Sequence, residues 1–419
     1  MTCQVAVMNK NGIALATDSA VTLGPQRKVY HSAEKLFRMS DTEPVAVMTY
    51  GNAELLGIPW GTIIKTYRRK LGERRFDLLE QYAEDFLRYL ESSNPLFPHE
   101  AQLECVRTHA IEYWRSQFLR SIWEKFSEET AEWPPEAWAI LSQAVLADRE
   151  IWGRYQKLTY LGPNFGDRVV DACGSVLDEV EAVLFDGVSV PSDIKAGLRN
   201  AIKMMHEQEY FCRQCTSGIV IAGFGEQEPF PKVLHYKVDT VAAGRLRYQK
   251  LGESEVTRSA DAFVMPFAQT HMVDLFYGGM FPSVQEKAPA ILESVLREHF
   301  EPQAEEKPGV VSDAQDSDTN SRVQAAVDDF IERLVADTGS SYTQPLIAAV
   351  GALPLSELCG LADALVSLTA FRARMSADEA SETVGGDIDV AAISKGDGFV
   401  WVQRKELVGA KAGRATRFL

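Results

Sequence analysis

The sequence predicts an α+β protein in which a long helical block interrupts segments that form β-sheets. Three observations support this class: short apolar runs separated by turn residues near the start, amphipathic helical patterns over residues 73–211, and strand patterns that return at residues 217–250. Apolar residues make up 46% of the chain and aromatic residues 10%, which allows a large core and excludes wholesale disorder. The 419 residues fit one architecture with insertions as well as two or three domains.

The first element is a β-hairpin. Residues 5–8 (VAVM) and 13–17 (IALAT) are short apolar runs, and Asn11 and Gly12 between them supply the positive φ angles that a tight turn needs. The hairpin should begin near residue 3 and tie down the start of the chain. A further strand is expected at Val45–Thr49, directly before Tyr50 and Gly51.

A helical pattern with a kink or break near Pro59 follows at residues 52–71. The patterns over 73–211 carry five of the seven tryptophans and predict an α-helical subdomain with its own core. The expected parts of the chain are residues 1–72 as the first half of the sheet-bearing core, 73–211 as the helical insertion, 212–300 as the continuation of the core, 301–320 as an acidic linker, and 321–419 as the C-terminal part of the core, which closes in a second hairpin at 388–402.

Charge and apolar patterning argue against several classes of partner. A net charge of -16 disfavours binding to nucleic acid or to anionic membranes. The chain shows neither a signal-peptide pattern nor an apolar run long enough for a membrane span, so a cytoplasmic protein is expected.

The cysteines and histidines show no ligand pattern that predicts a metal or another cofactor. Six cysteines at irregular spacing suit reduced thiols. Cys212 and Cys215 form a C-x-x-C motif, but no second pair stands nearby in the sequence and the seven histidines are scattered. We therefore expect a protein without a bound metal or cofactor.

Thr2 is the candidate nucleophile. If Met1 is removed, Thr2 carries a hydroxyl and a free α-amine on one residue, and that amine can take the hydroxyl proton. A nearby lysine ammonium would keep the amine neutral, and a carboxylate would hold the lysine. Residues whose numbers sum to about 20 to 23 face each other in a hairpin that turns at Asn11 and Gly12, which brings Asp18 beside Thr2.

These residues resemble a known family, the proteasome β-subunits and the bacterial HslV peptidase among the N-terminal nucleophile hydrolases. The resemblance is carried by T-x-x-V-A-V at Thr2–Val7, A-T-D-S-A-V-T-L-G at Ala16–Gly24, E-K-L-F at Glu34–Phe37, and the strand that ends in Tyr50 and Gly51. It implies a four-layer αββα sandwich with an inserted helical subdomain.

The resemblance also implies a site. Thr2 is the nucleophile, Asp18 and Lys35 are the pair that tunes it, and the Gly51 backbone N–H donates to the oxyanion. Ser19 is a supporting candidate. Where the family carries a serine before its third helix, this chain offers Gln269 or Thr270.

The implied function is a threonine peptidase that cleaves peptide or other amide bonds through an acyl-enzyme on Thr2. Two other functions stay open: a noncatalytic scaffold whose helical insertion binds a partner, and a small-molecule amidase. A homo-oligomer and an ATP-dependent unfoldase are left open as partners.

Overall fold

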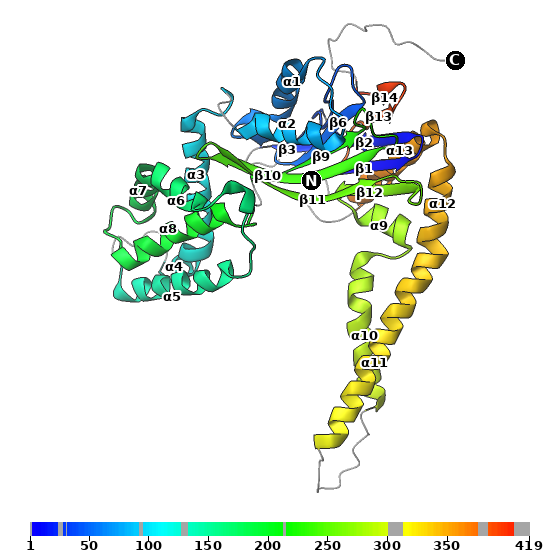
Figure 1. Cartoon of the computed structure of the whole chain (residues 1–419). Coiled ribbons are helices and arrows are strands. Elements are labelled where there is room, and N and C mark those ends of the chain that lie inside the picture. The colour runs from blue at the N-terminus through cyan, green and yellow to red at the C-terminus, as the bar shows by residue number, and fades with distance from the viewer. Residues whose placement is uncertain are drawn as a thin grey trace. The chain divides into compact units, whose positions relative to one another are not determined.

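The computed structural model describes residues 2–23, 28–30, 32–91, 95–126, 133–212, 215–300, 313–375 and 384–405. The chain forms two compact units: the first contains residues 1–36, 229–231 and 255–419, and the second contains residues 37–228 and 232–254. Each unit combines antiparallel strands with helices, which confirms the predicted α+β class (Figure 1). The stacking of four layers stays a prediction.

The first unit is built on a five-stranded sheet whose strand order is β12-β1-β2-β13-β14. Neighbouring strands pair antiparallel, and the predicted Asn-Gly hairpin forms its centre. The Asn9 carboxamide supports that turn, because its oxygen accepts from the Asn11 N–H at 2.8 Å and its nitrogen donates to the carbonyls of Val350 and Leu353 at 2.9 and 2.8 Å. The strands are β1 (Cys3–Asn9), β2 (Gly12–Thr17), β12 (Ala262–Ala268), β13 (Asp389–Ser394) and β14 (Gly398–Gln403).

Strand β12 was not predicted, because Pro266 interrupts its apolar run. A proline lacks the N–H that a central strand must donate, so it is tolerated mainly in edge strands. Strand β12 is an edge strand of this sheet, and Pro266 lies opposite Val5 of β1. A small second sheet in this unit pairs β3 (Val21–Leu23) with β4 (Lys28–Tyr30).

Helices cover one face of the five-stranded sheet. Alternate residues of β1, including Cys3, Val5 and Val7, share a buried apolar cluster with residues of α13, such as Leu358 and Leu365. The covering helices are α9 (His271–Gly278), α12 (Gln344–Ala352) and α13 (Leu355–Met375). The alternate residues of β1 that point to one side of the sheet therefore pack against the apolar residues of α13 in one core.

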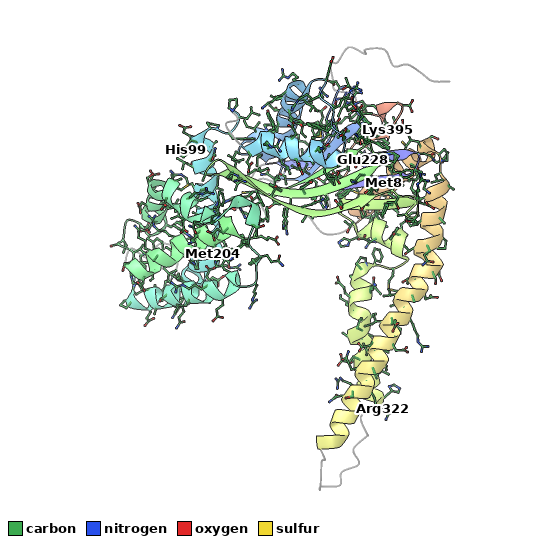
Figure 2. All side chains as sticks on the ribbon, in the orientation of Figure 1. Met8, His99, Met204, Glu228, Arg322 and Lys395 are labelled. Atoms are coloured by element: carbon green, nitrogen blue, oxygen red, sulfur yellow. The ribbon has the colours of Figure 1, made fainter. Side chains whose placement is uncertain are left out.

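Two long helices of the first unit form an arm. Helices α10 (Pro282–Phe300) and α11 (Asp313–Thr338) run side by side away from the sheet, and Arg322 lies toward the outer end of α11 (Figures 1 and 2). Helix α11 begins inside the expected acidic linker 301–320, and residues 301–312 lie outside the described part of the chain. A π-helical turn at Gly339–Thr343 joins α11 to α12.

The second unit contains a five-stranded sheet of order β11-β10-β9-β6-β5, with β6, β9 and β10 paired antiparallel. Helices α1 (Trp60–Leu71) and α2 (Leu79–Glu91) pack on this sheet through buried residues such as Ile63, Tyr67 and Phe86. The strands are β5 (Leu36–Arg38), β6 (Val45–Gly51), β9 (Ser217–Gly223), β10 (Lys232–Ala242) and β11 (Arg245–Glu255), beside a short pair β7 (Glu54–Leu55) and β8 (Ile58–Pro59).

The helices that follow α2 share a separate apolar cluster. Trp114 and Trp152 are buried in it, and the rings of Trp133 and Trp138 stack 4.8 Å apart beside Phe185. These helices are α3 (His99–Tyr113), α4 (Arg120–Phe126), α5 (Pro135–Trp152), α6 (Phe165–Ala172), α7 (Gly174–Leu184) and α8 (Ser192–Glu207), with a π-helical turn at Trp114–Leu119 and a 3-10 turn at Thr159–Leu161. Within the segment 73–211, α2 thus packs on the sheet, whereas α3 to α8 form their own core.

None of the described helices is long and apolar enough to cross a lipid bilayer.

Candidate functional site

Thr2 is fixed at the start of β1 by backbone pairing. Its carbonyl accepts a hydrogen bond from the Gln269 N–H at 3.0 Å, directly after β12, and β1 continues between β2 and β12. Thr2 is 6% exposed. The candidate nucleophile therefore lies at the rim of the sheet with an ordered backbone, as a positioned hydroxyl requires.

Cys3, the thiol beside Thr2, is part of the core. It is fully buried in the cluster between β1 and α13. Burial raises the pKa of the Cys3 thiol to about 12, although a hydrogen bond with Thr369 acts in the opposite direction. A buried thiol with a raised pKa is a poor nucleophile, so Cys3 does not compete with Thr2 for that role.

Asp18 is the centre of the candidate site. Its Oδ1 accepts from the Lys35 ammonium at 2.8 Å and from the Cys3 N–H at 3.1 Å, and its Oδ2 accepts from the Gly385 N–H at 3.1 Å. The carboxylate is fully buried, so these three donors replace water. Since the Cys3 nitrogen is bonded to the Thr2 carbonyl carbon, one carboxylate oxygen links Lys35 to the peptide that follows Thr2.

The observed hairpin register refines the predicted one. Gln4 pairs with Thr17, so the next position places Asp18 opposite Cys3, where the Asp18 N–H donates to the Cys3 carbonyl at 3.1 Å. Asp18 thus lies one residue along the strand from the position that faces Thr2. The pairing of Asp18 with Cys3 agrees with the predicted range of 20 to 23 for the sum of two facing residue numbers.

Lys35 is nearly buried, and its side chain is 8% exposed in the ion pair with Asp18. Burial lowers the pKa of Lys35 below its usual value, and the charge of Lys405 lowers it further, whereas the Asp18 carboxylate raises it. The net direction is downward because the desolvation of the ammonium outweighs the attraction of one carboxylate. A buried lysine whose pKa is shifted by a specific carboxylate partner is typical of functional sites.

A second buried ion pair braces the segment that carries Lys35. The Lys405 ammonium donates to Asp389 Oδ2 at 2.8 Å and to the Ala33 carbonyl at 2.5 Å. The Ala33 N–H donates in turn to the Ser19 carbonyl at 3.1 Å. The side chains of this pair are 5% and 2% exposed, so Lys405 and Asp389 hold the loop before Lys35 from inside the unit.

Sequence reasoning missed Asp389, Lys405 and Gly385. Asp389 had a usable signal, because a carboxylate in the apolar run IDVAAI must find a partner when that strand is buried. Lys405 and Gly385 had none, since their contacts depend on the pairing of β13 with β2, where Asp389 lies opposite Thr17.

The supporting candidates make backbone contacts around this site. The buried Ser19 donates its N–H to the Gly385 carbonyl at 3.2 Å, and Gln269 pairs with Thr2. Thr270 precedes α9, and its carbonyl accepts from the Asp274 N–H at 2.9 Å, while its side chain makes no capping hydrogen bond. Catalytic roles for these side chains stay predictions.

Gly51 belongs to the second unit and ends β6 opposite Ser217. Its φ of +81° is a conformation that residues with a Cβ rarely adopt, and an added Cβ would lie 2.6 Å from the Thr216 carbonyl oxygen. The backbone therefore requires glycine at this position. The donation of its N–H to an oxyanion stays a prediction.

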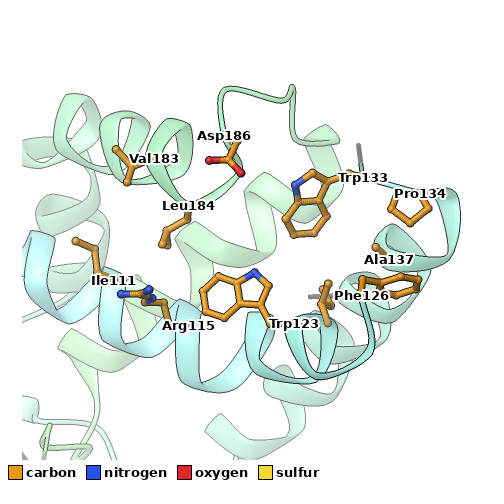
Figure 3. A pocket seen from close by; sticks show the side chains of 11 residues that line it. Ile111, Arg115, Trp123, Phe126, Trp133, Pro134, Ala137, Val183, Leu184 and Asp186 are labelled. Carbon is orange, nitrogen blue, oxygen red and sulfur yellow. The ribbon is translucent and has the colours of Figure 1, made fainter. Parts of the chain in front are cut away.

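A cavity of about 300 Å³ lies among the helices of the second unit. Figure 3 shows Trp123 and Trp133 on its walls, with Arg115 and Asp186 as charged groups at its edge. None of the site residues predicted from the sequence lines it. The cavity therefore belongs to the aromatic helices rather than to the Thr2 site.

No protein-family model and no curated protein matches this sequence. Similar solved structures are Anbu proteins. Anbu (ancestral beta-subunit) from Yersinia bercovieri is 10% identical, with 96% of this chain and 88% of that chain covered and a TM-score of 0.29. Anbu from Hyphomicrobium sp. strain MC1 is 10% identical, with 96% and 86% covered and a TM-score of 0.26. The Anbu complex from Pseudomonas aeruginosa, described as a helical assembly, is 10% identical, with 79% and 96% covered and a TM-score of 0.20.

These comparisons correct the resemblance to the proteasome β-subunits and HslV. The similar structures are Anbu proteins, at TM-scores that carry no argument about activity. The residues that carry the resemblance form a hairpin and short strands, and short apolar runs of this kind are common to many buried sheets. The function is therefore argued from the chain's own residues.

Proposed function

We propose that this protein is a hydrolase that cleaves amide bonds with the Thr2 hydroxyl as nucleophile once Met1 is removed. The observation that carries the proposal is the buried Asp18 carboxylate, which binds both Lys35 and the peptide N–H that follows Thr2. A buried lysine–carboxylate pair beside a terminal threonine provides what nucleophile activation needs: a charge that keeps the α-amine neutral, and a carboxylate that holds this charge.

The proposed reaction has two steps. The Thr2 oxygen bonds to the substrate carbonyl carbon while the Thr2 α-amine takes the hydroxyl proton. The C–N bond of the substrate then breaks, the leaving amine receives that proton, and an ester to Thr2 remains. Water deprotonated by the same amine hydrolyses the ester, which releases the acid and restores the hydroxyl. Lys35 and Asp18 set the electrostatic potential around the amine throughout.

The Asp389–Lys405 pair fits this proposal because Lys405 also binds the Ala33 carbonyl and so holds the segment that carries Lys35. The proposed substrates are peptides or other amides. A noncatalytic scaffold and an amidase for small molecules are distinguished from a peptidase by the activity measurements below.

Self-association is a separate part of the proposal. The Pseudomonas aeruginosa Anbu complex is described as a helical assembly, which is a property of that protein. We propose that this chain also forms homo-oligomers. Light scattering of the purified protein checks this, and a monomer at micromolar concentration would contradict it without affecting the hydrolase. An ATP-dependent unfoldase partner stays a prediction from the sequence.

The hydrolase is tested by kcat/KM on a panel of fluorogenic peptide amides and small acyl amides. Thr2→Ala should lower kcat/KM by at least about 10³-fold, because it removes the nucleophile. Thr2→Ser should keep measurable activity, since it retains a hydroxyl and an α-amine. Lys35→Met should lower kcat/KM by about 10²-fold or more, because it removes the charge that keeps the proton-accepting Thr2 α-amine neutral.

Lys250→Met is the matched control, because Lys250 pairs with Glu253 at an exposed site in the second unit and should leave kcat/KM unchanged. Undiminished turnover in a folded Thr2→Ala variant would contradict the nucleophile assignment. Absence of turnover on every substrate, with Met1 removed and the fold intact, would favour the scaffold. Turnover confined to the small acyl amides would favour the amidase.

A further inference from the structure

The C-x-x-C motif of the second unit lies beside a buried histidine from a distant part of the sequence. The Cys212 and Cys215 thiols and a ring nitrogen of His109 all lie within 4.8 Å of one another. His109 belongs to α3, where the chain enters the helical core, and the two cysteines precede β9, where it returns to the sheet. The sequence does not predict a metal site, because His109 lies far from the C-x-x-C motif along the chain and only the fold brings them together.

A candidate for a fourth ligand, Cys105, lies one helical turn from His109, outside the three-residue cluster. Cys105 and His109 are four residues apart on α3, so they project from the same face of the helix. The Cys105 Sγ lies 3.8 Å from His109 Nε2. In a tetrahedral zinc site, bonds of about 2.0 to 2.3 Å place neighbouring ligand atoms about 3.5 to 3.8 Å apart. The Cys105–His109 distance therefore already matches one edge of such a site.

His109 is buried beside these thiols. It is 1% exposed, and its Nε2 is the ring nitrogen that lies 3.8 Å from the Cys105 Sγ. An imidazole binds a metal ion through one ring nitrogen, so this geometry points to Nε2 as the ligand atom.

The surroundings position the ligands. The Arg247 guanidinium is fully buried and donates to the carbonyls of His206, Gln208 and Tyr210, at 3.1, 3.1 and 2.6 Å, which orders the chain just before Cys212. The Thr240 hydroxyl donates to the Cys105 Sγ at 3.0 Å. Such contacts to the ligating atoms and their loop are typical of structural metal sites.

The thiols of this cluster can provide the negative charge that a cation needs. The Cys212 thiol donates to Glu112 Oε2 at 3.3 Å and would give up this proton on binding a metal. The Arg247 guanidinium does not compete with the cation for the thiolates, because it is paired with the Asp239 carboxylate at 2.6 Å.

We propose that Cys105, His109, Cys212 and Cys215 bind one divalent cation of the zinc type in a closed, structural site. The bound ion joins the first helix of the helical core to the segment that leads into β9. Cysteine and histidine ligands in this proportion select zinc over magnesium or calcium, which prefer oxygen. This inference is independent of the Thr2 hydrolase.

The test uses the full chain without an affinity tag, expressed with added Zn²⁺ and dialysed against metal-free buffer. Elemental analysis should give one zinc per chain. After removal of zinc under reducing conditions, titration with Co²⁺ should produce the thiolate charge-transfer and tetrahedral ligand-field absorption bands and saturate at one cobalt per chain. Zn²⁺ should then displace the cobalt.

Variants assign the ligands. Cys212→Ser and Cys215→Ser should each weaken Co²⁺ binding by at least about 10²-fold, and Cys105→Ser by at least about tenfold. Cys359→Ala is the matched control, because Cys359 is buried in the first unit, outside this cluster. This variant should bind one cobalt per chain, as the wild type does. Unchanged cobalt affinity in Cys105→Ser would remove Cys105 from the ligand set.

The Tm of the wild-type protein provides a second readout, which does not depend on whether the variants fold. A strong chelator should lower the Tm of the wild-type second unit, and added Zn²⁺ should restore it. The proposal is overturned by a chain with reduced thiols that holds less than a tenth of an equivalent of metal and shows no cobalt bands. A Cys212–Cys215 disulfide found by mass spectrometry in the freshly isolated protein would also overturn it, in favour of redox chemistry.

Discussion

Asp18 and Lys35 form a buried ion pair whose two members depend on each other. The side chains are 0% and 8% exposed, and Asp18 also accepts from the Cys3 and Gly385 N–H groups. Removal of one member of a buried pair leaves an uncompensated charge in a medium of low dielectric constant. The stability of the first unit should therefore respond far more strongly to either single substitution than the number of hydrogen bonds suggests.

We expect Lys35→Met and Asp18→Asn each to lower the free energy of unfolding of the first unit by about 3 to 5 kcal/mol. The double variant should cost less than the sum of the two, by about 1 to 3 kcal/mol, because it removes both charges. Urea denaturation of the three variants and the wild type measures this cycle.

The control is the exposed ion pair between Lys10 and Asp261 in the same unit, whose side chains are 40% and 55% exposed. Lys10→Met should change the stability by less than about 1 kcal/mol. Strictly additive costs at Asp18 and Lys35 would show that the pair does not act as one unit, and would weaken its assignment as the group that tunes Thr2.

At the scale of elements, helices α5 and α8 approach each other at a glycine. A Cβ added to Gly197 of α8 would lie 2.0 Å from Cγ1 of Val145 on α5. Both residues are buried in the helical core. The two helices therefore pack as closely as they do because position 197 has no side chain.

Gly197→Ala should destabilise the second unit by about 1 to 3 kcal/mol through overpacking. Val145→Ala removes the methyl groups in the way, so the double variant should recover part of that loss. Gly174→Ala is the control, since a Cβ there meets no atom within 4 Å and α7 should tolerate it. Thermal unfolding followed by tryptophan fluorescence, which reports this core, measures the effect. Equal losses in the single and double variants would exclude the steric cause.

The local elements could be predicted from the sequence, but their partners could not. The hairpin at Asn11 and Gly12 follows from turn chemistry, and helix α13 follows from a regular apolar pattern. Strand β12 was missed because Pro266 is compatible with a strand only at a sheet edge, and a sequence alone does not tell which strands are edges.

The candidate site shows the same limit. Thr2, Asp18 and Lys35 lie within one short stretch, and hairpin register is enough to bring Asp18 near Thr2. Gly385 contacts Asp18 from 367 residues away, and only the pairing of β13 with β2 makes that contact. The sequence alone does not show a further ligand for Cys212 and Cys215 for the same reason, because only the tertiary packing of α3 brings His109 beside them.

At the scale of the whole molecule, three histidines favour the neutral state in the fold. Burial lowers the pKa of His109 to about 3 and of His235 to about 4, and it also lowers the pKa of His206. The unfolded chain binds these protons at about pH 6.5. Between the pKa of each histidine in the folded protein and its pKa in the unfolded chain, the unfolded state holds more protons. The stability contributed by the neutral histidines is therefore present above about pH 6.5 and is lost as the pH falls toward 4.

His235 tests this without touching either candidate site. Its Nε2 lies 2.6 Å from the Tyr50 hydroxyl, and glutamine at this position keeps a polar partner for Tyr50 without titrating. His235→Gln should remove about 1 to 2 kcal/mol of the stability difference between pH 7 and pH 5, as expected for one half-buried histidine. An unchanged slope in His235→Gln would contradict the assigned shift.

The central claim is that Thr2, freed of Met1, is a nucleophile. It is tested most directly by the intact mass and N-terminal peptide mass of the purified protein after exposure to a β-lactone, which acylates activated hydroxyl groups. We predict loss of Met1 and one adduct per chain located on Thr2, absent from Thr2→Ala and retained in Thr2→Ser. A retained Met1 with no adduct, or an adduct that persists in Thr2→Ala, would contradict the claim.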